Sequence, residues 1–239
     1  MAAEIVLLHG FTHTGASWDA VIAELPERYK ALAPDIRGHG AAAALPVNLR
    51  AVIDDIAELS ADRCTLVGYS MGGRLALHAA LALQSRLHRL VLIGASPGIE
   101  DPEERKRRRE SDERLAQEIE QETIEDFARR WASTTTVLAG QPARVLERAH
   151  ADRLRNTPTG LASALRALGT GALPSLWPRL PELQIPVTLV VGERDQKFGA
   201  IAGQMARQLP HADLVVVPAA GHAVHLEAPQ AVAKLIAPG

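Results

Sequence analysis

Six short runs of apolar and β-branched residues recur along the chain, and turn-forming residues close each of them. The runs are continuous rather than alternating, which is typical of strands buried on both faces of a sheet. Helix-like segments separate most of them, and this alternation predicts an α/β fold with a mostly parallel sheet flanked by helices. The expected strands are 4–10, 31–35, 64–68, 89–94, 186–192 and 213–218, and the expected helices are 17–25, 49–60, 72–84, 199–208 and 229–237.

The alternation breaks once, between residues 99 and 181. This stretch has no strand-like run and carries highly charged helical segments instead. An all-helical insertion between two strands predicts a lid over the carboxyl edge of the sheet, where ligands bind in open α/β folds. No repeat or low-complexity linker interrupts the chain. We therefore expect one folding unit, with a core of residues 1–98 and 182–239 and an inserted helical lid at 99–181.

Composition restricts the partners and the compartment. The formal net charge of −2 gives no reason to expect a nucleic acid or an acidic membrane surface as partner. No run approaches the ~20 apolar residues of a membrane span, and the apolar run near the N-terminus is too short for a signal peptide. The single cysteine, Cys64, allows no disulfide within the chain, which fits a reducing compartment. These features predict a cytoplasmic protein; the oligomeric state stays open.

The stretch G-Y-S-M-G-G-R at 68–74 joins an expected strand to an expected helix. G-x-S-x-G at such a junction predicts a nucleophile elbow, a turn so tight that the serine backbone is strained and flanking glycines avoid clashes. The hydroxyl of Ser70 then stands at a helix N-terminus, which favours negative charge. A serine that only caps a helix would not explain the three glycines of this stretch.

A nucleophilic serine needs a base, and the base needs an acid that orients it. Asp195 follows the expected strand 186–192, and His222 follows the expected strand 213–218. This chain order, serine then acid then histidine, is the order for an elbow of this type. Glu193 and Asp101 are the alternatives for the acid, and His225 is the alternative for the base. We expect the Asp195 and His222 loops to open at the edge of the sheet where the serine lies.

An anion hole is expected from two backbone N–H groups. One belongs to Met71, which directly follows the serine. The other belongs to Phe11, in the loop L-H-G-F-T-H-T-G at 8–15 after the first expected strand.

These motifs together resemble the α/β-hydrolase superfamily, in content and in order along the whole chain. They are H-G-F (9–11), D-I-R-G-H-G (35–40), G-Y-S-M-G-G (68–73), G-E-R-D (192–195) and G-H (221–222). The resemblance implies the α/β-hydrolase fold, here without room for the two usual leading antiparallel strands, so a sheet of about six strands. A serine at the elbow argues against the dehalogenases and epoxide hydrolases of this fold, which carry aspartate there.

Further stretches resemble one branch, the 2-succinyl-6-hydroxy-2,4-cyclohexadiene-1-carboxylate synthases of menaquinone biosynthesis. Where that branch would have a glutamine, this chain has Leu173. The resemblance implies a lyase that eliminates pyruvate from a polycarboxylated cyclohexene, with the serine, histidine and aspartate acting as the base and no acyl-enzyme required. The stretches are G-Y-S-M-G-G-R, R-R-R-E-S-D-E-R-L-A (107–116), the Phe127 and Trp131 pair, 156–171, S-L-W (175–177), 192–198 and 221–227.

A substrate with several carboxylates explains an arginine one helical turn after the serine. Arg74 is expected to pair bidentately with a carboxylate. In the lid, Arg108 fits the spacing of the branch best, and Arg105 and Arg109 stay as alternatives to it. A solvated helix face is the other interpretation of that basic run. Tyr69 is expected to donate its phenol to the same anion.

Two tryptophans, Trp131 and Trp177, are expected to wall the substrate pocket, although either would also serve as core of the lid. No cofactor is expected, because the sequence has neither a phosphate-binding loop nor the spacing of metal ligands. Two other functions stay open. One is a serine hydrolase (esterase, lactonase or carbon–carbon hydrolase) acting on a small carboxylated substrate, and the other is a ligand-binding protein of this fold without catalysis.

Overall fold

A computed structural model describes residues 3–59, 63–134 and 140–237. Its centre is a six-stranded sheet in the order β2-β1-β3-β4-β5-β6, with every neighbouring pair parallel. The predicted α/β fold with about six strands is therefore confirmed. The strands are β1 (Ala3–Leu8), β2 (Tyr29–Leu32), β3 (Cys64–Tyr69), β4 (Leu87–Ile93), β5 (Val187–Gly192) and β6 (Ala212–Val217).

The second strand begins and ends earlier than its sequence pattern predicted. We expected a strand at 31–35, but β2 spans Tyr29–Leu32, and its pairing with β1 ends where Val6 faces Leu32. Pro34 lies two residues beyond that point and has no backbone N–H to donate to a neighbouring strand. The apolar run therefore continues past the end of the strand without belonging to it.

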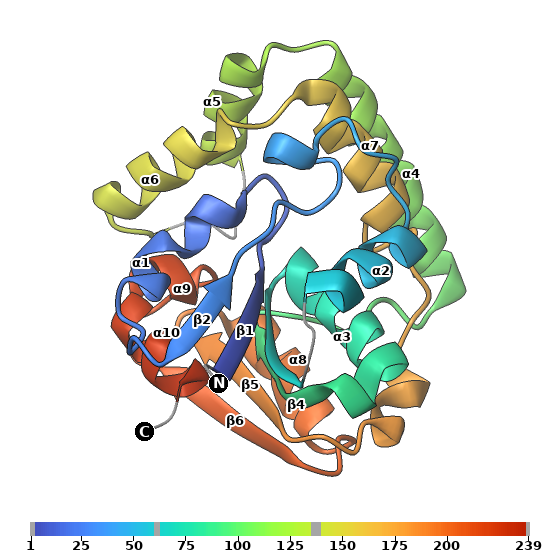
Figure 1. Cartoon of the computed structure of the whole chain (residues 1–239). Helices are drawn as coiled ribbons and strands as arrows, with labels where there is room; N and C mark the ends of the chain where they lie inside the picture. The colour runs from blue at the N-terminus through green and yellow to red at the C-terminus, as the bar shows by residue number, and fades with distance from the viewer. Residues whose placement is uncertain (1–2, 60–62, 135–139, 238–239) are drawn as a thin grey trace.

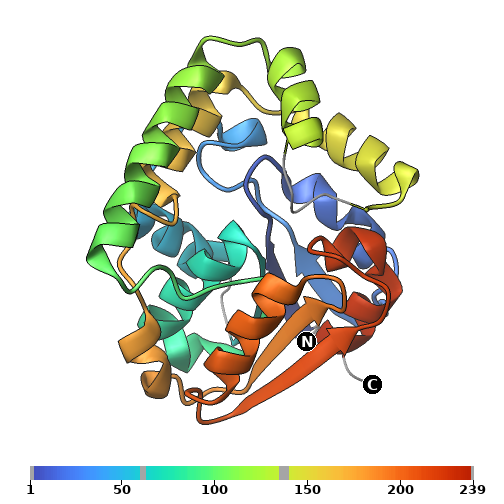
Figure 2. The same ribbon diagram turned by 180° about the vertical axis from the view of Figure 1, so that it is seen from behind.

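Helices cover both faces of the sheet (Figures 1 and 2). On each face, the core helices pack against the sheet through one cluster of buried apolar residues. The first expected helix, 17–25, is instead a 3-10 turn, η1 (Gly15–Trp18), followed by the short α1 (Asp19–Ile22). One face carries α2 (Leu49–Leu59), α3 (Met71–Leu83) and α8 (Gln196–Ala206), and the other carries α1, α9 (Val224–Glu227) and α10 (Pro229–Ile236).

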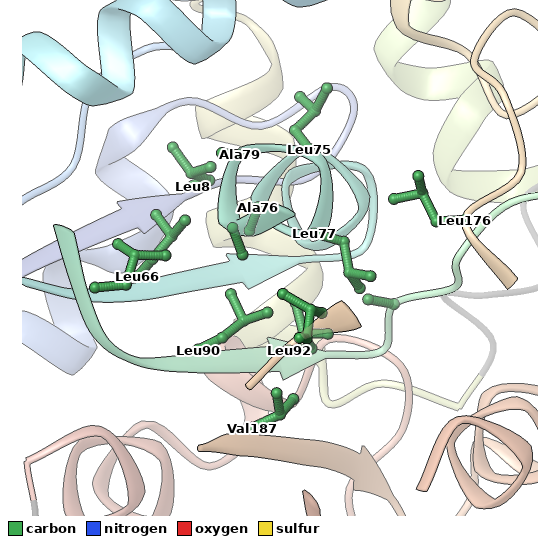
Figure 3. Packing of buried hydrophobic residues seen from close by; sticks show 14 of the residues in the cluster. Leu8, Leu66, Leu75, Ala76, Leu77, Ala79, Leu90, Leu92, Leu176 and Val187 are labelled. Atoms are coloured by element: carbon green, nitrogen blue, oxygen red, sulfur yellow. The ribbon is translucent and has the colours of Figure 1, made fainter. Parts of the chain in front are cut away.

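Packing around α3 fixes the position of the elbow. Leu66 and Leu90 point from neighbouring strands toward the side of α3 that carries Ala76 and Leu77 (Figure 3). All four side chains are fully buried. Burial of a leucine side chain contributes about 1.5–3 kcal/mol, so this layer holds α3 firmly on β3 and β4.

Between β4 and β5 the chain forms a helical insertion, named here by its described residues 99–134 and 140–181. Within those residues it contains no strand, as the sequence predicted. The described residues of the insertion from 102 to 168 lie above the carboxyl ends of the strands, toward the top of Figures 1 and 2. It has an apolar cluster of its own, which includes Ile119, Phe127 and Leu161. Its helices are α4 (Pro102–Glu120), α5 (Ile124–Thr134), α6 (Ala143–Arg153) and α7 (Pro158–Leu168), followed by η5 (Trp177–Glu182).

No helix in the described parts of the chain combines the length and the apolar character that crossing a membrane requires.

Candidate functional site

Ser70 lies in the turn between β3 and α3, with a φ of 51° and a ψ of −110°. A positive φ is strained for a residue other than glycine. The turn is possible because Gly68 and Gly72 flank it. A Cβ on Gly68 would lie 2.4 Å from the carbonyl oxygen of Gly72, and a Cβ on Gly72 would lie 2.4 Å from that of Leu8. The predicted strained serine between close-packed glycines is therefore present.

A chain of hydrogen bonds joins three side chains that the sequence placed on separate loops. His222 Nε2 lies 3.2 Å from Ser70 Oγ, and His222 Nδ1 lies 2.6 Å from Asp195 Oδ2. Because a carboxylate can only accept, the proton of the neutral imidazole belongs on Nδ1, and Nε2 is then free to accept from the serine. Asp195 also accepts a 3.3 Å hydrogen bond from the Phe198 amide at the start of α8, which holds its carboxylate in place.

The alternative residues make other contacts. Glu193 accepts from the Ala219 amide, and Asp101 caps α4 by accepting from the Glu104 amide at 2.7 Å. His225 is fully buried, and its ring lies 4.7 Å from the Trp18 ring. Burial lowers the pKa of His225 well below the ordinary value. None of these three alternatives takes a place in the hydrogen-bonded chain that reaches the serine.

A cavity of about 1150 Å³ opens above Ser70 and His222, between the carboxyl ends of the strands and the insertion. Phe11 and Met71, the two predicted contributors to an anion hole, both line it. Phe11 follows β1, and Met71 is the first residue of α3. The structure thus brings the predicted anion-hole residues and the serine to the lining of one cavity.

Two arginines from different parts of the chain also line this cavity. Arg74, on α3, is 6% exposed; its Nη2 donates to the Leu168 carbonyl at 2.9 Å, and its Nε has no partner among the described residues. Burial, with the nearby charge of Arg108, lowers the pKa of Arg74 to about 10. Arg108, on α4, donates from Nε to Asp112 at 2.7 Å. The cavity therefore holds two adjacent guanidinium groups, which is a favourable setting for carboxylates.

The other two candidate arginines of α4 are not among the lining residues. Arg109 donates from Nε and Nη2 to the Gly171 carbonyl, at 3.2 and 3.1 Å. Arg105 lies one helical turn before it and is partly exposed. Of the three arginines that the sequence left open, Arg108 is the one that reaches the cavity.

Both predicted tryptophans contribute to the cavity wall. The Trp131 ring lies 5.7 Å from the Phe11 ring and 5.5 Å from the Phe127 ring, so it links the core loop to the apolar centre of the insertion. Trp177 Nε1 donates to the Gly98 carbonyl at 3.2 Å. Each tryptophan ring thus packs against neighbouring residues of the protein on one side and lines the cavity on the other.

Tyr69 does not reach the cavity lining, which differs from the expectation. Side chains alternate between the two faces of a strand, so the Tyr69 side chain lies on the same face of β3 as Val67 and on the face opposite position 68. It packs with Val67 in the apolar cluster on the face of α1, α9 and α10, and its ring lies 4.2 Å from the His225 ring. Burial raises the pKa of Tyr69, so its phenol stays protonated.

Lys197 was not expected at the site from the sequence, but it lines the cavity from the first turn of α8, two residues after Asp195. Lys197 belongs to the motif 192–198, but the apolar pattern of that short stretch does not indicate which side of α8 its ammonium occupies. Within the described residues, no group of three or more metal-ligating side chains lies together.

Comparison with known proteins places the whole chain in one family. A model of the alpha/beta hydrolase family matches residues 5–235. A protein of Bacillus subtilis (strain 168) is 37% identical over 245 residues, which cover 97% of this chain and 88% of the relative. A protein of Enterobacter sp. (strain 638) named 2-succinyl-6-hydroxy-2,4-cyclohexadiene-1-carboxylate synthase is 35% identical, over 98% of this chain and 90% of the relative.

Solved structures match the fold over nearly the full length. MenH from S. aureus superimposes with a TM-score of 0.92 at 30% identity, covering 99% of this chain and 92% of that one. A thermophilic esterase from Thermogutta terrifontis, solved with malate bound, superimposes with a TM-score of 0.83 at 28% identity. The match covers 98% of this chain and 88% of the esterase.

Proposed function

The chain belongs to the alpha/beta hydrolase family, and we propose that it is a 2-succinyl-6-hydroxy-2,4-cyclohexadiene-1-carboxylate synthase, a lyase of menaquinone biosynthesis that eliminates pyruvate. The observation that carries the proposal is the placement of two neighbouring arginines, the buried Arg74 and the more exposed Arg108, in the cavity that also holds Ser70 and His222. Hydrolysis of a neutral ester needs no such pair, whereas a substrate with several carboxylates does.

In this proposal Ser70, His222 and Asp195 act together as a catalytic triad used as a base. His222 Nε2 accepts the serine proton, and the serine oxygen removes a proton from a substrate carbon next to a carbonyl. Asp195 holds the imidazole in the required tautomer and stabilises it when it becomes charged. The electrons of the broken C–H bond move toward the carbonyl and then expel the leaving group, whose carbon–oxygen bond breaks to release the enolate of pyruvate. The proton held by His222 passes to this enolate and gives pyruvate, while the serine keeps the proton taken from the substrate. No acyl-enzyme forms.

The charge that develops on the carbonyl oxygen needs donors that are already in place. We assign the Met71 and Phe11 amides to this role, because both residues line the cavity wall beside the serine. Met71 begins α3, so the partial positive charge of the helix N-terminus adds to its N–H. A preorganised donor of this kind typically contributes a factor of ~10²–10³ in rate.

Substrate carboxylates are assigned to Arg74 and Arg108. Guanidinium groups bind carboxylates in a fixed fork, which sets orientation as well as charge. Trp131 and Trp177 provide apolar walls for the ring of the substrate. The insertion would then act as a lid, because Arg108, Trp131 and Trp177 all belong to it.

A serine hydrolase acting on a small carboxylated substrate is the second candidate. The observation that favours it is the match at 28% identity to an esterase whose structure was solved with malate, a dicarboxylate. Both reactions use the same three side chains, so the arrangement of Ser70, His222 and Asp195 does not separate them.

Pyruvate release from the synthase substrate separates the two functions. We expect wild type to release pyruvate, and both Ser70→Ala and Arg74→Ala to lose most of that activity. Arg109→Ala is the matched control, because it removes a guanidinium that bonds within the insertion and stays outside the cavity lining. Nitrophenyl esters are assayed in parallel. Rapid ester hydrolysis without pyruvate release would refute the lyase and favour the hydrolase.

We also propose a cytoplasmic location, with the small carboxylated substrate as the partner. The support is the single buried cysteine, Cys64, which needs no oxidising compartment. Fractionation of cells that express the chain tests this: recovery outside the cytoplasmic fraction would contradict it.

A further inference from the structure

The end of α6 and the residues just after it are fastened to the loop that follows β1. Asp152 accepts a 3.0 Å hydrogen bond from the Thr14 amide, a second one from the Thr14 hydroxyl, and lies 3.0 Å from His13 Nδ1. Asp152 is 7% exposed. Burial acts to raise the pKa of Asp152, but the hydrogen bonds from His13 and Thr14 outweigh it and lower the pKa. The carboxylate is thus an ionised anchor between the insertion and the core.

Asn156 makes a second attachment to the same loop, at Thr12. Thr12 is two residues nearer than Thr14 to Phe11, the proposed contributor to the anion hole. Its Nδ2 donates to the Thr12 carbonyl at 2.9 Å, and its Oδ1 accepts from the Gly40 amide at 3.1 Å. Arg153 adds a 3.3 Å hydrogen bond from Nε to the Thr12 hydroxyl. Asn156 is 4% exposed and Arg153 is 1% exposed, so water does not compete for these contacts.

The residue that receives these bonds has an unfavourable backbone conformation. Thr12 has a φ of 69°, which a β-branched residue rarely adopts. It is the second central residue of a turn in which the His13 amide donates to the Gly10 carbonyl at 3.2 Å. This position of a turn with positive φ favours glycine. Strained residues of this kind persist only where the surrounding contacts hold them, and they gather at functional sites.

The first central residue of the same turn is Phe11, whose amide we assigned to the anion hole. We propose that Asn156 and Asp152 are positioning residues, which hold the Gly10–His13 turn and the following Thr14 from the insertion and so aim the Phe11 amide at the developing charge. The insertion therefore builds part of the catalytic site and does not only cover it. The catalytic part of this inference rests on the proposed function, since the role of the Phe11 amide belongs to that proposal.

Asn156→Asp is the sharpest test. Aspartate has nearly the same shape and still accepts from Gly40, but it replaces the donor to the Thr12 carbonyl by an acceptor. We expect kcat for pyruvate release to fall about 10- to 100-fold, somewhat less than the full loss of an anion-hole donor. KM should stay within about threefold of wild type, because the substrate-binding arginines are untouched.

Thr157→Ala is the matched control. Thr157 is the next residue, and its hydroxyl accepts from the Gly160 amide and caps α7 without touching the turn. Loss of this cap should lower the melting temperature while kcat stays at the wild-type value. If Thr157→Ala lowers kcat as much as Asn156→Asp, or if Asn156→Asp leaves kcat within about twofold of wild type, the inference is wrong. Should Asn156→Asp not fold, Asn156→Ala is measured in the same way.

A rescue experiment adds a readout that a merely structural role would not move. Glycine adopts a φ near +69° without strain, so Thr12→Gly should lessen the dependence of the turn on Asn156. We expect the Thr12→Gly, Asn156→Asp double variant to have a kcat at least about threefold above that of Asn156→Asp, since the strain no longer has to be held. No recovery would count against positioning through Thr12.

A crystal structure of Asn156→Asp separates this inference from the proposed function. We expect Thr12 to relax to a negative φ and the Phe11 amide to turn; a φ that stays near 69° with Phe11 unmoved overturns the inference. If wild type releases no pyruvate, the proposed function fails. The crystal structure and the kcat for nitrophenyl ester hydrolysis, which needs the same anion hole, then still decide the positioning role.

Discussion

Arg74 should lower the stability of the protein while it serves the reaction. Arg74 is 6% exposed, and burial lowers the pKa of its guanidinium from the ordinary value to about 10. At about 1.4 kcal/mol per pH unit, this difference corresponds to about 3 kcal/mol of cost for keeping the charge in the folded state. Both values lie above 7, so the guanidinium is charged in the folded and the unfolded chain at neutral pH. The cost is therefore fully present at pH 7 and is relieved only when the pH rises past about 10.

Replacing the buried charge by an apolar side chain of similar length removes this cost. Arg74→Met also loses the hydrogen bond from the charged guanidinium to the Leu168 carbonyl, which contributes about 1.5–3 kcal/mol. The expected net effect is a gain of up to about 1.5 kcal/mol. For a chain of this size, 1 kcal/mol moves the melting temperature by about 2–4 °C, so Arg74→Met should melt up to about 3–6 °C higher than wild type and not lower. The same variant should lose most of its pyruvate release, because the carboxylate loses its charged partner.

Differential scanning calorimetry at pH 7 checks the stability, and the pyruvate assay checks the activity. Arg166→Met is the control, since Arg166 is well paired: its guanidinium bonds to Glu113 and Glu120 on α4. That variant should melt lower than wild type. A melting temperature of Arg74→Met below that of wild type, with unfolding still cooperative, would refute the reasoning that burial of this charge opposes folding.

Three further predictions concern the elbow, the triad and acid stability. Gly72→Ala should lower the free energy of unfolding by about 3 kcal/mol or prevent folding, because the new Cβ would lie 2.4 Å from the His9 carbonyl oxygen. Gly199→Ala is the control: a Cβ there would have no atom within 4 Å, so the variant should be as stable as wild type or more stable. Urea denaturation of both variants measures the difference. Asp195→Asn should lower kcat for pyruvate release about 10³–10⁴-fold with little change in melting temperature, and a loss under tenfold would contradict its orienting role. Burial lowers the pKa of His9 to about 4 and that of His39 to about 3. Below about pH 6.5 the unfolded chain therefore binds protons that the folded chain does not. Each histidine should remove about 2 kcal/mol of stability between pH 6.5 and 5, and His39→Phe should lessen the measured loss by about that amount.

Much of the fold follows from local pattern. Continuous apolar runs predicted all six strands and their parallel arrangement, because a strand buried on both faces needs no polar alternation. The elbow pattern was equally local, because Gly68 and Gly72 lie within two residues of Ser70 and Gly68 avoids a clash with the start of α3. The close approach of Gly72 to Leu8, at the end of β1, is by contrast a tertiary contact. The order of the serine, acid and histidine motifs then indicated which loops to compare.

The tertiary structure decided what those local patterns left open. Packing of α1, α9 and α10 on one face of the sheet buried Tyr69 in the apolar cluster of that face, away from the cavity, although it is next to Ser70 in the sequence. The packing of α4 brings Arg108 to the cavity lining and leaves Arg105 and Arg109 outside it. The attachment of Asn156 to Thr12 joins residues 144 positions apart. The physical reason is common to all three cases. Such contacts depend on how the elements pack in space, and the spacing of residues along one strand or helix does not contain that information.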